Sequence, residues 1–152
     1  MRLFVAVSPD ETVNVAIDAA VAGLDGASWR PVARERRHVT LRFHADADPE
    51  VVAVDLQRAL DGRPAVPSLH CRGAGTFGTA LWLGVHPDDG AAWERLLLAV
   101  GADPAGHVAH LTVARGRGPV PDVLREHHGP PWRPDAVVLV ASGTPYRVLG
   151  RF

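Results

Sequence analysis

The chain has 152 residues, of which 47% are hydrophobic and 22% charged, and its formal net charge is −1. These values are typical of one ordinary globular domain, and they exclude a disordered, collagen-like or coiled-coil chain and strong charge-driven binding of nucleic acid. Cys71 as the one cysteine excludes an internal disulfide framework, and the absence of lysine among the 16 Lys and Arg residues excludes lysine-dependent chemistry.

The hydrophobic pattern predicts strands and helices in mixed order. Apolar runs and period-two alternation indicate strands, whereas apolar side chains at helical spacing after Ser, Asp or Pro indicate helices. In chain order, the predicted elements are a strand over 2–7, a helix that starts at 8–11 and ends by 23–26, a short strand over 29–32, a strand over 38–44, a helix from 48–50 to 60, a hairpin over 68–77 and 80–85, a helix from 88–90 to 100, a strand over 110–114, one or two helical turns over 122–127, and a hairpin over 137–141 and 146–152. Because strands often adjoin strands, this order indicates an α+β fold with antiparallel sheet, not a doubly wound parallel one.

The chain contains an internal repeat of the form His-x-Thr-apolar. It occurs at residues 38–41 as His-Val-Thr-Leu and at 110–113 as His-Leu-Thr-Val, about half a chain length apart. Each copy lies in a predicted strand, as a duplicated lobe would place it. Successive side chains of a strand point to opposite faces, so each copy shows a His and a Thr on one face and aliphatic side chains on the other.

Two imidazoles and two hydroxyls around one cleft suit phosphodiester chemistry. One imidazole takes a proton from an attacking water, and the other gives a proton to the departing sugar oxygen, which histidine does well because its ordinary pKa is about 6.5. Threonine hydroxyls donate to phosphate oxygens. No acidic residues near either motif have metal-ligand spacing, so we expect no metal. The alternative is that the two histidines are structural or surface residues, since the chain has 8 histidines.

With their surroundings, these motifs resemble the two-histidine (2H) phosphoesterase superfamily, in particular the bacterial and archaeal RNA 2′,3′-cyclic phosphodiesterases historically called LigT or 2′-5′ RNA ligases. The resemblance covers nearly the whole chain and is carried by residues 1–7, 29–32, 38–43, 75–77, 81–85, 110–115 and 146–149. It implies a bilobal α+β fold with two antiparallel sheets, helices packed outside and pseudo-twofold symmetry around a central cleft. Residues 1–152 would form a single domain of two intertwined lobes, each with one His-x-Thr motif.

The resemblance also implies an activity, which is metal-independent hydrolysis of RNA 2′,3′-cyclic phosphodiester ends to 2′-phosphomonoesters without a cofactor. It makes His38 the proton donor to the 3′ oxygen and His110 the proton acceptor that activates water, although the sequence itself does not separate the two roles. The expected partner is RNA with a cyclic phosphate end or a small cyclic nucleotide. We expect a monomer with no obligate protein partner and no membrane association.

Five further residues are candidates for the site. The resemblance implies that Arg115, five residues after His110, contacts phosphate, and Thr40 and Thr112 are expected to bind it too. Strict alternation would put Arg115 on the wrong face, so only a bulge or strand end would turn it in. Phe43 has the equivalent place after His38 and is a candidate to stack a base, with core packing as the alternative. Arg42 shares the predicted face of His38 and Thr40 and is a candidate contact for phosphate or RNA backbone, although many strand-end arginines do neither.

The sequence departs from the family pattern beside both motifs. His44-Ala45 stands where Leu-Gly is usual, and Gly106-His107-Val108-Ala109 lacks the usual arginine and proline. We interpret His44 and His107 as rim residues of the cleft. These departures bear on the cleft edges and on substrate preference rather than on the histidine pair.

Two other functions remain open at this point. The same site run backwards would join RNA ends through a 2′-5′ bond, although water at high concentration favours hydrolysis. A non-catalytic RNA- or nucleotide-binding module would need the arginine and aromatic contacts but not two titrating imidazoles. The apolar opening at 2–7 is stopped by Pro9 and Asp10, too early for a secretory signal or a bilayer span, so we expect a cytoplasmic protein.

Overall fold

The computed structural model describes residues 1–63 and 66–152. Its elements in chain order are β1 (Leu3–Val7), α1 (Glu11–Val21), β2 (Trp29–Pro31), η1 (Arg34–Arg36), β3 (Val39–His44), α2 (Pro49–Leu60), β4 (Leu69–Phe77), β5 (Ala80–Pro87), α3 (Gly90–Ala99), η2 (Pro104–Gly106), β6 (His110–Gly116), α4 (Asp122–Arg125), β7 (Val138–Ala141) and β8 (Arg147–Arg151), where η marks a 3-10 helix. The predicted α+β class with antiparallel sheet is confirmed. The segment predicted at 122–127 is a single helical turn, α4.

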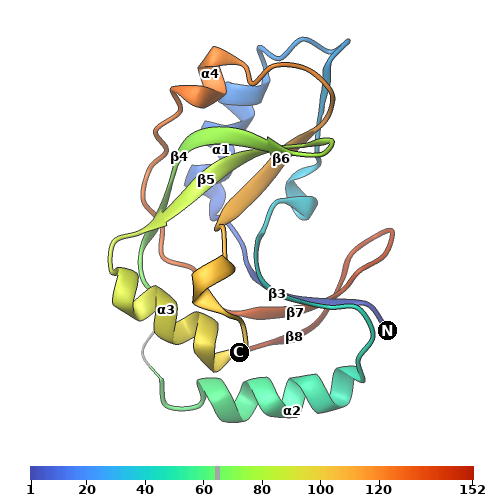
Figure 1. Ribbon diagram of the computed structural model, residues 1–152, viewed down its shortest axis with the longest axis vertical. Coiled ribbons are helices and arrows are strands. Elements are labelled where there is room, and N and C mark those ends of the chain that lie inside the picture. Colours follow the sequence, from blue (N-terminus) through green and yellow to red (C-terminus); the bar gives the residue numbers. More distant parts are fainter. Residues whose placement is uncertain (64–65) are drawn as a thin grey trace.

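The described strands form one antiparallel sheet in the order β4-β5-β6-β3-β1-β7-β8, and β2 pairs with β6. Figure 1 shows two groups of strands, with β4, β5 and β6 in its upper part and β3, β7 and β8 in its lower part. The two groups meet where β3 and β6, the strands of the two motifs, pair at Val39 and Leu111. The two expected sheets are therefore continuous with each other, and the two motifs lie on neighbouring strands at their junction.

Aspartate caps start the three long helices, as the sequence pattern predicts. The side chains of Asp10, Asp48 and Asp89 accept hydrogen bonds from backbone N–H groups in the first turns of α1, α2 and α3. Such caps satisfy backbone donors that have no partner within the helix. None of the described helices is long and apolar enough to cross a membrane.

The two faces of the sheet differ in what they pack against. The helices cover one face and form the main core, whose buried members include Leu3, Val5, Val13, Ile17, Leu41, Leu56, Trp93, Leu97 and Leu111. The other face carries a small apolar cluster of Phe4, Ala6, Val138 and Val140, with Tyr146 packed against it. Alternate residues of β1 thus serve the two faces, and the small cluster marks the face that the helices leave open.

Candidate active site

β3 contains a β-bulge just after the first motif. The consecutive residues Val5 and Ala6 of β1 pair with Arg42 and Thr40, so Leu41 is an extra residue. A bulge shifts the alternation of the strand by one residue, and side chains beyond it exchange faces. Thr40 therefore shares the open face with Ala6, whereas Arg42 shares the helix-covered face with Val5.

β6 contains a bulge at the equivalent place, three residues after its motif histidine. Its register against β5 shifts between Leu81 and Trp82, which leaves Val113 as the extra residue. Beyond Val113 the alternation is shifted, so Arg115 lies on the face of Thr112. The bulge that Arg115 needs in order to face the motif side chains is therefore present.

Arg42 does not lie on the face that strict alternation predicts for it. Its guanidinium donates to the carbonyl oxygen of Val100, at the C-terminal end of α3, over 3.1 Å. A Cβ added at Gly101 would overlap the same guanidinium, which shows how closely the two residues pack. The bulge turns the Arg42 side chain away from His38 and Thr40, so its guanidinium contacts α3 and it does not line the cavity of the two motifs. Arg42 does, however, help to line a neighbouring groove, which Thr40 and His110 also line.

A cavity of about 310 Å³ brings the two motifs together on the open face of the sheet. Its lining residues are Val32, Arg36, His38, Thr40, His110, Thr112, Arg115 and Tyr146. They include both predicted catalytic histidines and all three predicted phosphate-binding residues. Arginine, histidine and hydroxyl side chains line it and, among the described residues, no carboxylate does, so the cavity favours an anionic ligand.

Each motif histidine is oriented by the backbone carbonyl two residues before it. The Nδ1–H group of His38 donates to the carbonyl of Arg36 over 2.9 Å, and that of His110 donates to the carbonyl of Val108 over 2.7 Å. A carbonyl only accepts, so the neutral rings carry their proton on Nδ1 and keep a lone pair on Nε2. Nε2 is therefore the atom of each ring that can exchange a proton with a ligand.

Aromatic rings enclose His38. Phe4 stacks on its imidazole with ring centroids 4.4 Å apart, and Tyr146 meets it edge-on at 5.6 Å. Burial, together with the positive charges of His110, Arg36 and Arg115, lowers the pKa of His38 to about 4 against the opposing effect of the backbone hydrogen bond. His38 is thus neutral near pH 7 when no anion occupies the cavity.

A groove of about 370 Å³ adjoins the cavity and shares Thr40 and His110 with it. Phe43 and Phe77 both line this groove, and they are 49% and 48% exposed. Phe77 also packs edge-on against His110, with centroids 5.1 Å apart. Half-exposed aromatic rings beside a cavity that favours an anionic ligand are suited to stack a nucleobase, and Phe43 is not buried in the core.

His107 connects the strand of the first motif to the loop before the second. Its Nε2–H group donates to the carbonyl of Thr40 over 2.9 Å, and its ring meets Trp93 edge-on. β3 and β6 pair at Val39 and Leu111, so this hydrogen bond spans the place where the two strands separate. His107 lines the groove, as a rim residue would, but it also fixes the backbone at Thr40.

Replacing His107 with Phe keeps a ring of similar shape and removes the donor to Thr40. We expect the free energy of unfolding to fall by roughly 1–3 kcal/mol, the cost of leaving a partly buried carbonyl without its partner. Urea denaturation measures the change, and His107→Gln, which keeps an N–H donor, is expected to recover part of it. His86→Phe is the matched control, because His86 meets the carbonyl of Arg72 at 3.2 Å on the exposed surface. Equal stability of His107→Phe and His86→Phe would contradict the proposed cross-link.

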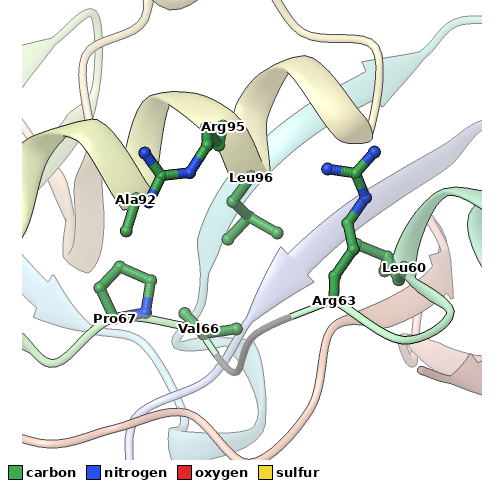
Figure 2. A pocket seen from close by; sticks show the side chains of 7 residues that line it. All are labelled: Leu60, Arg63, Val66, Pro67, Ala92, Arg95 and Leu96. Carbon is green, nitrogen blue, oxygen red and sulfur yellow. The ribbon is translucent and has the colours of Figure 1, made fainter.

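A second pocket lies beside α3, at the end of α2, and Figure 2 shows its side chains. Arg63 and Arg95 stand beside apolar side chains that include Leu60, Val66 and Leu96. Among the described residues that line it, none is a group that titrates near neutral pH. Unlike the cavity lined by His38 and His110, the described residues of this pocket offer no group for acid–base chemistry at neutral pH.

Within residues 1–63 and 66–152, no group of three or more His, Cys, Asp or Glu side chains is arranged to hold a metal ion. The ring of His70 lies 5.5 Å from that of His86 and 5.8 Å from that of His128, measured between centroids, but these three side chains are not arranged to hold a metal ion either. Burial lowers the pKa of His70, and the positive charges of His86, His128 and Arg72 lower it further.

Comparison of the sequence with protein-family models and with curated proteins finds no match. The structure, in contrast, matches solved structures along its whole length. TT0787 of Thermus thermophilus is 26% identical with a TM-score of 0.68, and the match covers 100% of this chain and 97% of that one. E. coli LigT complexed with 3′-AMP is 22% identical with a TM-score of 0.75, covering 99% and 96%, and a phosphoesterase is 22% identical with a TM-score of 0.65, covering 99% and 96%. This chain has the LigT fold, as its two motifs predict.

Proposed function

We propose that this chain, which has the LigT fold over its full length, is a metal-independent 2H phosphoesterase that hydrolyses RNA 2′,3′-cyclic phosphodiester ends to 2′-phosphomonoesters. The observation that carries the proposal is the single cavity lined by His38, Thr40, His110, Thr112 and Arg115. E. coli LigT has been solved with 3′-AMP, ATP, NADP+ and phosphate, all of which carry phosphate groups. A ligand of this class suits the positive cavity and the aromatic groove next to it.

In the proposed reaction, the two imidazoles act on opposite sides of the phosphorus. Nε2 of His110 takes a proton from water as the water oxygen bonds to phosphorus. The bond from phosphorus to the ribose 3′ oxygen breaks, and Nε2–H of His38 gives its proton to that oxygen. The products are a 2′-phosphomonoester and a free 3′ hydroxyl, and proton exchange with solvent restores both imidazoles.

Charge builds on the phosphate oxygens as water adds, and three side chains of the cavity are suited to stabilise it. Thr40 and Thr112 present hydroxyl donors beside the two imidazoles, and Arg115 adds a guanidinium that can donate two parallel hydrogen bonds. The nucleobase would lie in the adjoining groove, against Phe43. RNA ends and small cyclic nucleotides share these features, so both belong to the proposed substrate class.

Turnover of cyclic phosphates in the presence of EDTA tests the proposed function. The substrates are nucleoside 2′,3′-cyclic phosphates and a short RNA with a cyclic end, and chromatography identifies the position of the product phosphate. We expect conversion to the 2′-phosphomonoester. Addition of a second RNA with a 5′ hydroxyl would show a longer product if the site also joins ends. A folded protein that leaves every cyclic phosphate intact would overturn the assignment, and the cavity would then belong to a binding module.

The pH dependence of this reaction follows from the environment of His38. The active pair carries one proton, and a second proton removes the base. Because the pKa of His38 in the free protein is about 4, we expect the acid limb of the kcat/KM profile, in which kcat/KM falls about tenfold per pH unit, to lie below about pH 4. The bound phosphate anion favours protonated His38. The kcat profile reports the enzyme–substrate complex, so its acid limb is expected at higher pH than that of kcat/KM. Stopped assays with a circular-dichroism check of folding measure the acid limbs of both profiles, and an acid limb of kcat/KM near pH 6.5 would contradict the desolvation of His38.

A further inference from the structure

Arg36 lines the cavity although it belongs to neither His-x-Thr motif. It is the last residue of η1, two residues before His38, and its own carbonyl orients that histidine. Its guanidinium carbon lies 4.1 Å from the centroid of the Tyr146 ring. Among the described residues, no carboxylate pairs with this guanidinium, so its charge is available to a ligand in the cavity.

The neighbouring arginines of the same segment have structural partners instead. Arg34 pairs with Glu11 and Asp18 of α1, and Arg37, which is almost completely buried, pairs with Asp18 over 2.7 Å. These contacts fasten the segment to α1. The three arginines therefore divide into two that hold the segment in place and one, Arg36, that lines the cavity.

Tyr146 supports Arg36 from the far end of the chain. Its ring faces the guanidinium, and its edges meet His38 at 5.6 Å and Phe4 at 5.1 Å between centroids. A cation held over an aromatic face loses little of its ability to donate hydrogen bonds in the plane of its guanidinium. The same aromatic ring thus fixes both the first motif histidine and the arginine beside it.

We propose that Arg36 is a second phosphate-binding arginine, which contacts the phosphate held between His38 and His110 together with Arg115. The inference rests on the proposed phosphoesterase function and adds a residue to it. Arg36 and Arg115 line one cavity, and the charges of both act on His38. A cyclic phosphodiester carries one negative charge, and the addition of water increases the charge on its oxygens. A second guanidinium therefore stabilises the transition state more than the bound substrate, and its effect should appear mainly in kcat.

The test compares Arg36→Gln, Arg36→Lys and the control Arg58→Gln, whose arginine is exposed on α2. We expect Arg36→Gln to lower kcat/KM by about 10- to 100-fold, mostly through kcat, and Arg36→Lys to recover part of the loss. Arg58→Gln is expected to stay within about twofold of the unchanged protein. The loss should be equal for adenosine 2′,3′-cyclic phosphate and for its 5′-phosphorylated form. A loss confined to the 5′-phosphorylated substrate would place Arg36 on another phosphate and overturn the proposal.

Binding of inorganic phosphate gives a readout that does not depend on turnover. Calorimetry with the unchanged protein and with Arg36→Gln is expected to show weaker phosphate binding in the variant, and less so in Arg36→Lys. Loss of binding without any turnover by the unchanged protein would refute the proposed function but support the arginine site. Phosphate affinity and kcat that are the same in Arg36→Gln and Arg58→Gln would overturn the inference.

Discussion

Replacing either His38 or His110 with alanine is expected to lower kcat/KM for a nucleoside 2′,3′-cyclic phosphate by roughly 10²- to 10⁴-fold. Each ring presents Nε2 to the same cavity, because its Nδ1 is held by a backbone carbonyl. Alanine removes the only atom at each position that can move a proton. Steady-state hydrolysis with purified variants measures the loss.

The two histidines are expected to differ once the leaving group no longer needs a proton. A p-nitrophenyl phosphodiester releases a stable phenolate, so the general acid contributes little to its hydrolysis. We expect His38→Ala to retain most of the activity on this substrate, whereas His110→Ala, which lacks the base, loses activity on both substrates. The opposite pattern would reverse the two roles, and equal losses on both substrates would argue that neither residue is a dedicated acid.

Folding of the variants must be controlled because His38 is packed. His38→Ala removes a ring that stacks on Phe4, so His38→Gln, which keeps more of the volume, should be compared with it. His128→Ala is the matched control, since this histidine is exposed and lies outside the cavity. Full activity of either motif variant, with folding intact, would remove the basis of the mechanism.

The sequence predicts the order of elements and the pairing of the motifs well, because both depend on local patterns. Aspartate caps, apolar spacing and glycine stops act within one turn or one strand, and they are readable without tertiary contacts. The repeat of His-x-Thr is likewise local. Its placement in two strands is confirmed by β6 and by β3, except that β3 begins at Val39 and leaves His38 just before the strand. The pairing of these two strands at Val39 and Leu111 is not local, because it depends on how all the strands of the sheet are arranged.

The direction of the side chains after each motif could be predicted only conditionally. Alternation alone places Arg42 with His38 and leaves Arg115 on the far side, and both placements are reversed by the bulges at Leu41 and Val113. A bulge arises from the way neighbouring strands pair, so the residue types within one strand do not predict it. Its repetition at the same place in both strands explains why the fifth residue after each histidine faces the open side of the sheet.

Two residues around His38 that sequence reasoning missed come from segments far from the motifs. Tyr146 lies near the C-terminal end of the chain and Phe4 near its start, and together they enclose His38. Their pattern in the sequence is that of ordinary strand residues, and their role appears only when β1 and the segment before β8 lie beside β3. The low pKa of His38, which burial causes, is a consequence of the same long-range packing.

Arg115→Ala is expected to lower kcat/KM by roughly 10²- to 10³-fold, because the variant loses a charged donor to the phosphate oxygens at the stage when their charge increases. Arg115→Lys keeps the charge but not the two parallel donors of a guanidinium, so we expect it to recover only a minor part. The backbone of Arg115 pairs with Arg30 of β2 and with Ala80 of β5, which should preserve the strand in both variants.

Arg117→Ala is the matched control for this position. Arg117 lies two residues beyond Arg115 and does not line the cavity, and its backbone N–H donates to Ser28, a contact that alanine keeps. Its effect on kcat/KM is expected to stay within about twofold.

If Arg115 and Arg36 bind the same phosphate, the double variant Arg115→Ala with Arg36→Gln should lose less than the product of the two single losses, because residues that act on one group are not independent. Fully multiplicative losses would place the two arginines on different parts of the substrate. An Arg115→Ala variant as active as Arg117→Ala would mean that Arg115 takes no part in catalysis, although the bulge in β6 turns it toward the cavity.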